Sequence, residues 1–285
     1  MPLLIRPTRR QFLAAAAAIP ALAQPKPAHW ALLSDTHIFA DKTGEYRGFR
    51  PYDNLKRVLP QVQAAHPDGV LINGDLAKLE GLTADYELLK SMIEPVAQSM
   101  PLCLSLGNHD DRKNFMGVMG KLSRGVTQPV ESKHVLVLDQ PPVRFIVLDS
   151  LMTTNVAAGL LGKTQRTWLQ NYFGASDDTP VIIFVHHTMD DGDNSLLDAD
   201  RLLHLTRGVR KVKAIIYGHS HAYHYDSEYD IHLINIPAVG YNFADSEPVG
   251  WVEAMFYPDH GSFQLHAFGG NTKDDRKARM LTWRQ

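Results

Sequence analysis

Residues 70–112 read VLINGDLAKLEGLTADYELLKSMIEPVAQSMPLCLSLGNHDDR, and this stretch decides the fold. Two short apolar segments, VLIN and LCLSL, have the composition of buried strands, and an amphipathic helical pattern near residues 83–98 separates them. Alternating strands and helices predict βαβ units around a largely buried sheet. Each strand segment leads into a polar turn: Gly74-Asp75 after the first, and Gly107-Asn108-His109-Asp110 after the second.

Three more polar turns follow apolar, strand-like segments elsewhere in the chain. They are Asp35-Thr36-His37 after ALLS, His186-His187 after VIIFV, and Gly218-His219-Ser220-His221 after KAIIY. If all five segments are strands of one such architecture, their polar turns emerge at the same end of the strands. The sequence therefore predicts a single site at that edge.

The carboxylate, amide and imidazole side chains in these turns are of types that bind metal ions, and no thiolate is among them. Seven donors are too many for one ion, because a catalytic zinc-like site uses three protein ligands and an open position. Two ions that share a bridging carboxylate fit the count, and Asp75 is our choice of bridge. Oxygen and imidazole ligands favour two divalent or mixed-valence ions of Mn, Fe, Zn or Co, without choosing among them. The candidate ligands are Asp35, His37, Asp75, Asn108, His186, His219 and His221.

The order of the motifs, Asp-x-His, Gly-Asp, Gly-Asn-His-Asp, His and Gly-His-x-His, resembles the calcineurin-like metallophosphoesterase superfamily over roughly residues 29 to 225. Residues 74–112 look most like its class III branch of cyclic-nucleotide and glycerophosphodiester phosphodiesterases. Beyond residue 130 the strand-like segments follow one another faster, which favours two packed sheets. Together with the resemblance, this implies an α/β fold: a four-layer αββα sandwich of two mixed β-sheets flanked by helices, with a dimetal site at carboxyl ends of strands.

Carried onto this sequence, the family pattern implies how the ligands divide between two ions. One ion would be held by Asp35, His37 and His221, and the other by Asn108, His186 and His219, with Asp75 between them. His186 is favoured over His187 because it follows the strand directly. His187 would then lie behind the ligands or face the substrate.

Two such ions, about 4 Å apart, acidify a bridging water and neutralise the charge that develops on a phosphoester, so a bridging hydroxide is the expected nucleophile. His109 has no ligand role in this assignment and is the candidate general acid for the leaving group, worth roughly 100- to 10,000-fold. Asp110 is expected to orient the His109 ring through a hydrogen bond. The predicted catalytic residues are therefore Asp75, His109 and Asp110.

Substrate contacts are predicted from Asn108, His109, Arg112 and His187. The Arg112 guanidinium could bind a phosphate, or it could form a salt bridge with Asp110 or Asp111. Four loops without ligands, at 39–51, 111–130, 152–163 and 240–250, are candidates for substrate selection. Their aromatic side chains could stack on a base, cover a lipid headgroup or pack on the core: Tyr46, Phe49, Phe115, Tyr241 and Phe243.

The first functional hypothesis is a dimetal phosphodiesterase whose small-molecule phosphoester substrate is a cyclic nucleotide or a glycerophosphodiester. A phosphomonoesterase that uses the same site is the second, and an exported metal-binding protein without activity is the third. The unliganded His109 argues against the third, because a site built only to hold metal has no need of such an imidazole. It does not separate the first two.

The N-terminus has the features of an export signal. Arg9-Arg10 precede Phe12-Leu13 and an alanine-rich segment, and Ala21-Leu22-Ala23 is a small-residue cleavage site. We expect residues 1–23 to be a twin-arginine signal peptide, through which the twin-arginine export machinery delivers the folded protein to the periplasm or exterior of a bacterium; the alternative is a surface helix of a cytoplasmic protein. Residues 28–268 are expected to form the catalytic domain, and the charged residues 269–285 a loose, surface-lying tail.

The charge and composition of the chain limit the kinds of partner that the sequence supports. The formal net charge is −2 and becomes −5 without the three arginines of the signal, so nucleic-acid binding gains no support. The single cysteine, Cys103, cannot form an internal disulfide and is expected in the core. Beyond the signal, the chain has no run of 18 or more apolar residues, so its apolar segments are too short to predict a membrane-spanning helix. The acidic loop at 190–194 fails the EF-hand spacing and is interpreted as solvated. The sequence leaves the oligomeric state open.

Overall fold

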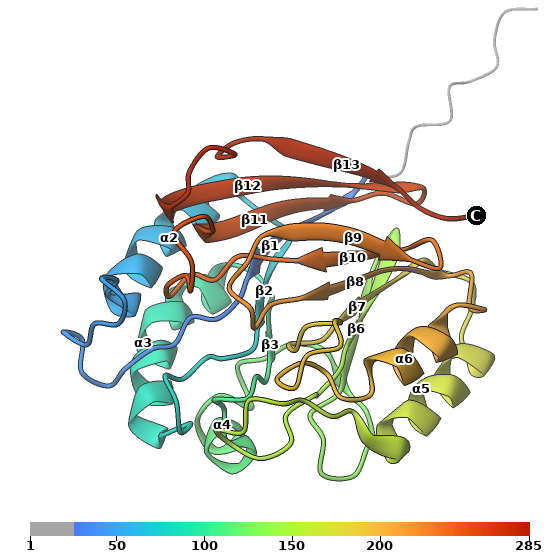
Figure 1. Ribbon diagram of the computed structural model, residues 1–285, viewed down its shortest axis with the longest axis horizontal. Helices are drawn as coiled ribbons and strands as arrows, with labels where there is room; N and C mark the ends of the chain where they lie inside the picture. The colour runs from blue at the N-terminus through green and yellow to red at the C-terminus, as the bar shows by residue number, and fades with distance from the viewer. Residues whose placement is uncertain (1–25) are drawn as a thin grey trace, which may run out of the picture.

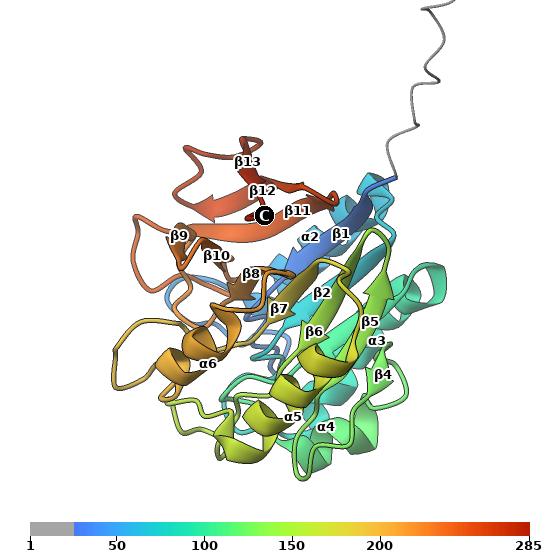
Figure 2. The ribbon, with the colours of Figure 1, turned by 90° about the vertical axis from the view of Figure 1, so that its right-hand side faces the viewer.

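The computed structural model describes residues 26–285, and the predicted signal peptide at 1–23 lies outside the described part of the chain. The described chain forms two mixed β-sheets packed face to face, with helices on both outer faces (Figures 1 and 2). This arrangement confirms the predicted four-layer αββα sandwich.

The first sheet has six strands in the order β13-β12-β11-β1-β2-β3. β1 (Ala28–Leu33), β2 (Gly69–Asn73) and β3 (Leu102–Ser105) run parallel to one another. β11 (Pro248–Phe256), β12 (His260–Gly270) and β13 (Ala278–Thr282) extend the sheet in antiparallel pairs. The helices α2 (Pro51–Ala65) and α3 (Thr83–Ser99) connect the parallel strands, as the βαβ pattern predicts. The short α4 (Arg112–Val118) follows β3 and is an element that the sequence pattern did not indicate.

The second sheet has seven strands in the order β4-β5-β6-β7-β8-β10-β9. Its parallel centre consists of β6 (Val143–Val147), β7 (Val181–Phe184), β8 (Val212–Tyr217) and β10 (Ile231–Asn235). Antiparallel strands close both edges, namely β4 (Val126–Thr127) with β5 (Leu136–Gln140) on one side and β9 (His224–Glu228) on the other. α5 (Gly162–Ala175) and α6 (Ala199–Thr206) cover its outer face.

Three apolar layers hold the sandwich together. The layer between the sheets is rich in aromatic rings, and Trp30 and Phe256 of the first sheet meet Phe145 of the second at ring-centroid distances of 5.1 Å. The other two layers lie between each sheet and its own helices. The parallel strands are therefore buried on both faces, which explains why they read as continuous apolar runs instead of alternating ones.

Pro60 and Pro95 lie within helical patterns, and such positions predict a kink or an early end. Neither helix ends early, since α2 continues to Ala65 and α3 to Ser99. Both prolines are on exposed positions of their helices. Each proline has no N–H to donate to the carbonyl four residues before it. Because the prolines are exposed, that carbonyl can bond to water instead, and the helix continues past the proline.

The end of the chain differs from the expected loose tail at 269–285. Residues 278–282 form β13, an edge strand paired with β12, and the following Trp283 is buried. Arg284 is also buried, and its guanidinium donates to backbone carbonyls of five residues around the end of α6, namely Thr206, Arg207, Val209, Val212 and Tyr229. The charged composition of this stretch hid the strand, because an edge strand keeps one side in water and carries polar residues there.

The sequence predicts that Cys103 forms no internal disulfide and that no helix spans a membrane, and the described residues bear on both predictions. Cys103 is a free, buried cysteine in β3, where burial raises its pKa to about 12 and so keeps it an unreactive thiol. Within residues 26–285, no helix has the length and apolar character needed to cross a bilayer.

Candidate metal centre

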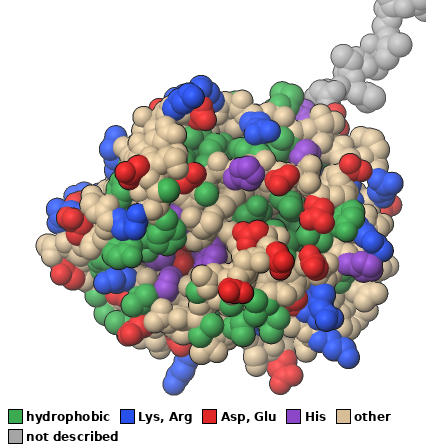
Figure 3. Space-filling model, in the orientation of Figure 1, with side chains coloured by type: hydrophobic (Ala, Val, Ile, Leu, Met, Phe, Trp, Pro, Cys, Tyr) green, Lys and Arg blue, Asp and Glu red, His purple; other side chains and the backbone are tan. Residues whose placement is uncertain are grey.

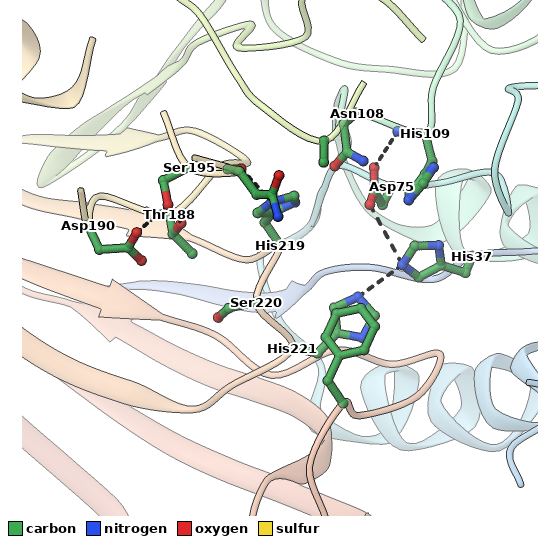
Figure 4. A pocket seen from close by; sticks show the side chains of 13 residues that line it. His37, Asp75, Asn108, His109, Thr188, Asp190, Ser195, His219, Ser220 and His221 are labelled. Carbon is green, nitrogen blue, oxygen red and sulfur yellow. Dashed lines mark hydrogen bonds and ion pairs between the residues drawn. The ribbon is translucent and has the colours of Figure 1, made fainter. Parts of the chain in front are cut away.

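The predicted polar turns do converge, at the carboxyl ends of β1, β2, β3, β7 and β8 (Figure 4). They line a cavity of about 440 Å³, to which residues His37, Asp75, Asn108, His109, His219 and His221 all contribute. Histidine side chains are visible at the surface among acidic and hydrophobic side chains in the view of Figure 3. Two sheets supply one site because β1, β2 and β3 belong to the first and β7 and β8 to the second.

The first group of donors consists of Asp35, His37 and His221, all of them buried. The Nε2 atom of His221 lies 3.3 Å from Asp35 Oδ1 and 3.0 Å from His37 Nε2. A carboxylate and two imidazoles that face one another so closely form a ready ligand set for a cation.

The second group consists of Asp75, His186 and His219. The Nε2 atom of His186 lies 3.4 Å from Asp75 Oδ2, and it is buried without a hydrogen-bond partner. The side-chain oxygen of Asn108 is also buried without a partner and lines the same cavity. The group thus has the carboxylate, amide and imidazole donors predicted for a second ion.

Asp75 lies between the two groups, as Figure 4 shows. Its Oδ2 atom is 3.4 Å from His186 of its own group and 3.7 Å from His37 Nε2 of the other. Its Oδ1 atom accepts the backbone N–H of His109 at 2.8 Å, which fixes the carboxylate plane. Asp75 therefore reaches donors of both groups, as does Asp35, whose Oδ1 lies 3.8 Å from His186 Nε2.

Backbone carbonyls set the orientation of every imidazole in the site. His37 donates from Nδ1 to the carbonyl of Lys78 at 3.1 Å, and His186 donates from Nδ1 to that of Asn73 at 2.8 Å. The ring of His221 bonds in the same way to Tyr241, while that of His219 uses Nε2 to bond to Asn194 at 2.9 Å. One ring nitrogen therefore bonds to a carbonyl in each case, and the other is the one left for a ligand role.

These carbonyl partners have no signature in the sequence. Asn194 belongs to the acidic loop that was interpreted as merely solvated, yet its carbonyl orients a ligand. No side-chain pattern could have identified these groups, because every residue type carries the same carbonyl.

The ligand turns have an uncommon backbone. Asp35, His37, Asp75, His219 and His221 all have positive φ values, between 44° and 68°, a region that residues with a side chain seldom adopt. Such strain concentrates at functional sites, where the surrounding fold enforces it.

Two motif glycines make room for these turns. A Cβ on Gly74 would lie 2.5 Å from the His186 ring, and one on Gly107 would lie 2.1 Å from Asp75 Oδ1. The glycines of the Gly-Asp and Gly-Asn-His-Asp motifs therefore allow the strand ends to approach one another.

Burial and charge prepare the protonation states of the ligands. Burial lowers the pKa of His37 to about 4, and burial together with the neighbouring His186 lowers that of His219 to about 4, so both rings are neutral. Burial opposes the charged form of His186 as well, but Asp75 and Asp35 outweigh it and raise the His186 pKa to about 10. In return, His186 holds the pKa values of both carboxylates low in spite of their burial.

His109 stands beside the donors without belonging to either group. Its ring lies 5.5 Å from that of His37, and its Nδ1 donates to the carbonyl of Leu79 at 3.1 Å. Its Nε2 is therefore the nitrogen left for a substrate. It is the free imidazole that the sequence predicts at this place.

Asp110 does not orient His109, contrary to the expectation. Its carboxylate points back into the core, where it accepts from the backbone N–H of Gly107 at 2.8 Å and from the Tyr86 hydroxyl at 2.9 Å. It also accepts from Leu76 and Ala77 N–H groups, and burial raises its pKa to about 6. Asp110 ties the Gly-Asn-His-Asp turn to the turn after β2, and the Leu79 carbonyl takes over the role predicted for it.

Arg112 does not line the cavity. Its guanidinium forms a two-point salt bridge with Asp149, with both N–O distances at 2.8 Å, and also reaches the carbonyl of Leu151. The salt-bridge alternative is therefore the one observed, although the partner is Asp149 and not Asp110 or Asp111. Asp149 lies far along the sequence and carried no signal that could have linked it to Arg112.

His187 lies behind the second group of donors. Its Nδ1 is 2.7 Å from the Ser150 hydroxyl, and its ring is 4.7 Å from that of His219. It is fully buried and does not line the cavity, so His186 occupies the ligand position and His187 supports it from behind.

These features fit a pair of metal ions on physical grounds. Six buried side-chain atoms of the described residues have no hydrogen-bond partner, and three of them, Asp35 Oδ1, Asn108 Oδ1 and His186 Nε2, belong to the predicted ligands. Such atoms are costly in the absence of a cation. Oxygen and nitrogen donors without sulfur match the ions named from the sequence.

Comparison with curated protein sequences gives relatives at modest identity. The chain is 27% identical over 246 residues to a probable cyclic nucleotide phosphodiesterase of Synechococcus sp.. The aligned region covers 83% of this chain and 91% of that protein. It is 28% identical over 200 residues to the 3′,5′-cyclic adenosine monophosphate phosphodiesterase CpdA of Vibrio vulnificus, covering 66% of this chain and 68% of the relative.

Solved structures share the fold at lower identity. A dimetal phosphatase from Danio rerio superposes with a TM-score of 0.71 at 17% identity, over 90% of this chain and all of that one. A purple acid phosphatase from yellow lupin seeds gives 0.67, also at 17% identity, over 91% of this chain and 54% of the other. The calcineurin-like phosphoesterase family model matches residues 29–223, a span that contains all five converging strand ends. On that match, the chain belongs to the calcineurin-like phosphoesterase family.

Proposed function

We propose that this protein is a dimetal phosphodiesterase that hydrolyses small phosphodiesters, with cyclic nucleotides as the first substrates to test. The observation that carries the proposal is the free His109 imidazole beside two groups of metal donors in one cavity. Relatives named as cyclic nucleotide phosphodiesterases, with aligned regions that cover 83% and 66% of this chain, support the choice of substrate class.

The donor groups would hold two transition-metal ions of Mn, Fe, Zn or Co, with Asp35, His37 and His221 on one and Asn108, His186 and His219 on the other, and with Asp75 shared. When bound, such ions acidify water and neutralise the charge of a phosphoryl group under attack. The carbonyl partners of the four imidazoles keep the ligand nitrogens aimed into the cavity, so little reorganisation is needed on binding.

His109 acts on the leaving group in this proposal. The protonated ring keeps one N–H on the Leu79 carbonyl and offers the other, on Nε2, to the ester oxygen as the P–O bond breaks. The proton passes to the departing alkoxide, and the ring is left neutral with Nδ1–H still on Leu79. The hydrogen bond from the His109 backbone to Asp75 couples the acid to the bridging carboxylate.

The test is the ratio of kcat/KM for bis(p-nitrophenyl) phosphate over p-nitrophenyl phosphate, measured on protein reconstituted with manganese, with Asp75→Ala as the control. We expect the diester to be preferred and Asp75→Ala to abolish turnover of both. A preference for the monoester would move the protein to the phosphomonoesterases, and turnover that survives Asp75→Ala would place the reaction elsewhere.

We also propose that the protein is exported through the twin-arginine route. Arg9-Arg10 and the Ala21-Leu22-Ala23 site support this proposal. The test is fractionation of bacteria that express the wild type and an Arg9→Lys/Arg10→Lys variant. Export predicts a periplasmic or secreted protein that begins at Gln24, and cytoplasmic retention of the variant; a full-length wild type in the cytoplasm would refute it.

A further inference from the structure

Two loops far apart in sequence pack together beside the cavity, and Phe243 of the second loop lines it. The segment 240–243 is fixed to the site at two points, because the Gly240 N–H donates to the Asp35 carbonyl at 2.9 Å and the Tyr241 carbonyl accepts from His221. Arg47, from the loop after β1, reaches across to donate to the carbonyls of Asn242 and Phe243. The segment therefore has little freedom to move relative to the donors.

The loop that carries Arg47 is itself well defined. Tyr46 and Phe49 exchange two backbone hydrogen bonds of 2.9 Å, which close a tight turn with Arg47 and Gly48 at its tip. The Tyr46 ring packs edge-on against Tyr241 at a centroid distance of 4.8 Å. The contact between the two loops is thus made by both backbone and aromatic groups.

Phe243 is the side chain that this arrangement presents to the cavity. Its ring stacks on His221 at a centroid distance of 4.2 Å and an interplanar angle of 25°. It nevertheless remains 47% exposed and lines the cavity. A ring that packs against a metal donor on one side and is open on another offers an apolar surface directly beside the metal centre.

The rest of the cavity has a different character. Its far end is formed by polar side chains, including Thr188, Asp190 and Ser195 (Figure 4). Of the described residues that line the cavity, Phe243 is the one with a purely hydrocarbon ring. A flat apolar part of a substrate would therefore lie at the Phe243 end, with hydroxyl groups or water at the other. The volume of about 440 Å³ suits a small ligand.

We propose that Phe243 is a specificity-determining residue that stacks on the nucleobase of a cyclic nucleotide whose phosphate lies at the donor groups. This inference rests on the proposed phosphodiesterase function. Aromatic stacking accepts every base because each base has a π-face, so the residue selects nucleotides over diesters without a ring. Arg47 is the positioning residue that holds the platform in place.

The experiment compares kcat/KM for 3′,5′-cyclic AMP and for glycerophosphoethanolamine, a diester without a ring, on the manganese-loaded full-length chain. Loss of one base-stacking contact predicts a fall of roughly 5- to 150-fold for cyclic AMP in Phe243→Ala. Glycerophosphoethanolamine turnover should stay within about twofold of the wild type, and Phe243→Trp should restore the nucleotide. Phe243→Leu keeps apolar bulk without a ring and should behave like Phe243→Ala.

Tyr229 provides the matched control. It is 49% exposed, like Phe243, but lies between β9 and β10, before the amino end of β10 and thus at the opposite end of the sheet from the site. Tyr229→Ala should change neither substrate. Metal content is measured for each variant, because Phe243 touches a donor.

The outcomes separate the two proposals. An equal fall for both substrates in Phe243→Ala would make the ring a support of His221, and no fall for either would leave it without a role; both results overturn the stacking proposal. Wild-type protein that cleaves bis(p-nitrophenyl) phosphate but not cyclic AMP would overturn it while the phosphodiesterase function stands. Protein that cleaves no diester at all would instead refute the proposed function.

Discussion

The Nε2 atoms of His37 and His221 lie 3.0 Å apart, although each ring donates its other nitrogen to a backbone carbonyl. When neither Nε2 carries a proton, the two nitrogens present lone pairs to each other and cannot form a hydrogen bond. With Asp35 Oδ1 3.3 Å from His221, the same atoms make a favourable ligand set once a cation joins them. The contact is a feature of a fold shaped around bound metal.

Removal of metal should therefore destabilise the protein. Chelation of the reconstituted protein with EDTA, followed by dialysis, is expected to lower Tm by roughly 5–10 °C, since ligands at a hundredfold excess over Kd contribute about 2.7 kcal/mol. Differential scanning calorimetry with and without added Mn²⁺ measures the difference. Equal Tm values for the two samples would show that the donors hold no ion in the folded state.

Asp75→Ala tests the bridging position. Loss of a ligand shared by both ions should reduce the bound metal from two equivalents to one or fewer, with kcat falling below detection, because neither ion keeps its full ligand set. Mass spectrometry of the metal content measures the stoichiometry. Asp226→Ala, which removes an exposed carboxylate of β9, is the control and should retain two equivalents. Two ions retained by Asp75→Ala would exclude the bridge.

His109→Ala tests the general acid. The variant should lose roughly 100- to 10,000-fold in kcat on a diester with an alkyl leaving group, and far less on one with a p-nitrophenolate leaving group, which needs no proton. The comparison of the two substrates is the measurement. His204→Ala, an exposed histidine of α6, should affect neither. A loss of the same size on both substrates would assign His109 to binding or positioning instead.

Arg112→Ala distinguishes a structural role from phosphate binding. Asp149 is completely buried and accepts both guanidinium bonds, and without Arg112 its remaining cation is Lys133 at 3.9 Å, so the substitution should cost about 1.5–3 kcal/mol in the free energy of unfolding. Urea denaturation gives the stability, and KM for the diester should remain within about twofold of the wild type. The reverse pattern, a raised KM with unchanged stability, would return Arg112 to the substrate site.

Metal uptake should release a proton. Without metal, the carboxylates raise the His186 pKa to about 10, so the ring is protonated at neutral pH, whereas His37 and His219, with pKa values near 4, are already neutral. A ligating imidazole must be neutral, so affinity should rise with pH by about tenfold per unit between pH 7 and 9. Calorimetric titration in buffers of different ionisation enthalpy counts the protons; an affinity independent of pH in this window would contradict the prediction.

Much of the fold was open to prediction because its parallel strands are buried on both faces and read as uninterrupted apolar runs. VLIN and LCLSL became β2 and β3, and the segment between them became α3. β13 escaped because an edge strand leaves a weak pattern, and only its pairing with β12 reveals it. The short α4 was missed because seven residues carry too little periodicity to stand out.

The site was predictable where a motif places a side chain and unpredictable where the backbone decides. The donors Asp35, His37 and His221 meet as expected, since strand ends bring them together. Asp110 is adjacent to His109 in the sequence, but this adjacency does not determine where its side chain points. Buried N–H groups of the turn after β2 compete for its carboxylate. The Arg112–Asp149 pair depends on tertiary contacts that no local pattern contains.

The carbonyl groups that aim His37, His109 and His219 belong to Lys78, Leu79 and Asn194, which bond to these rings through the backbone alone. Each of the three residues could be exchanged for another amino acid and the acceptor oxygen would remain. The orientation of these imidazoles therefore does not depend on which side chains surround them, and the residues at the mouth of the cavity can change without disturbing it. A lineage could change what enters such a pocket many times over while inheriting the same chemistry.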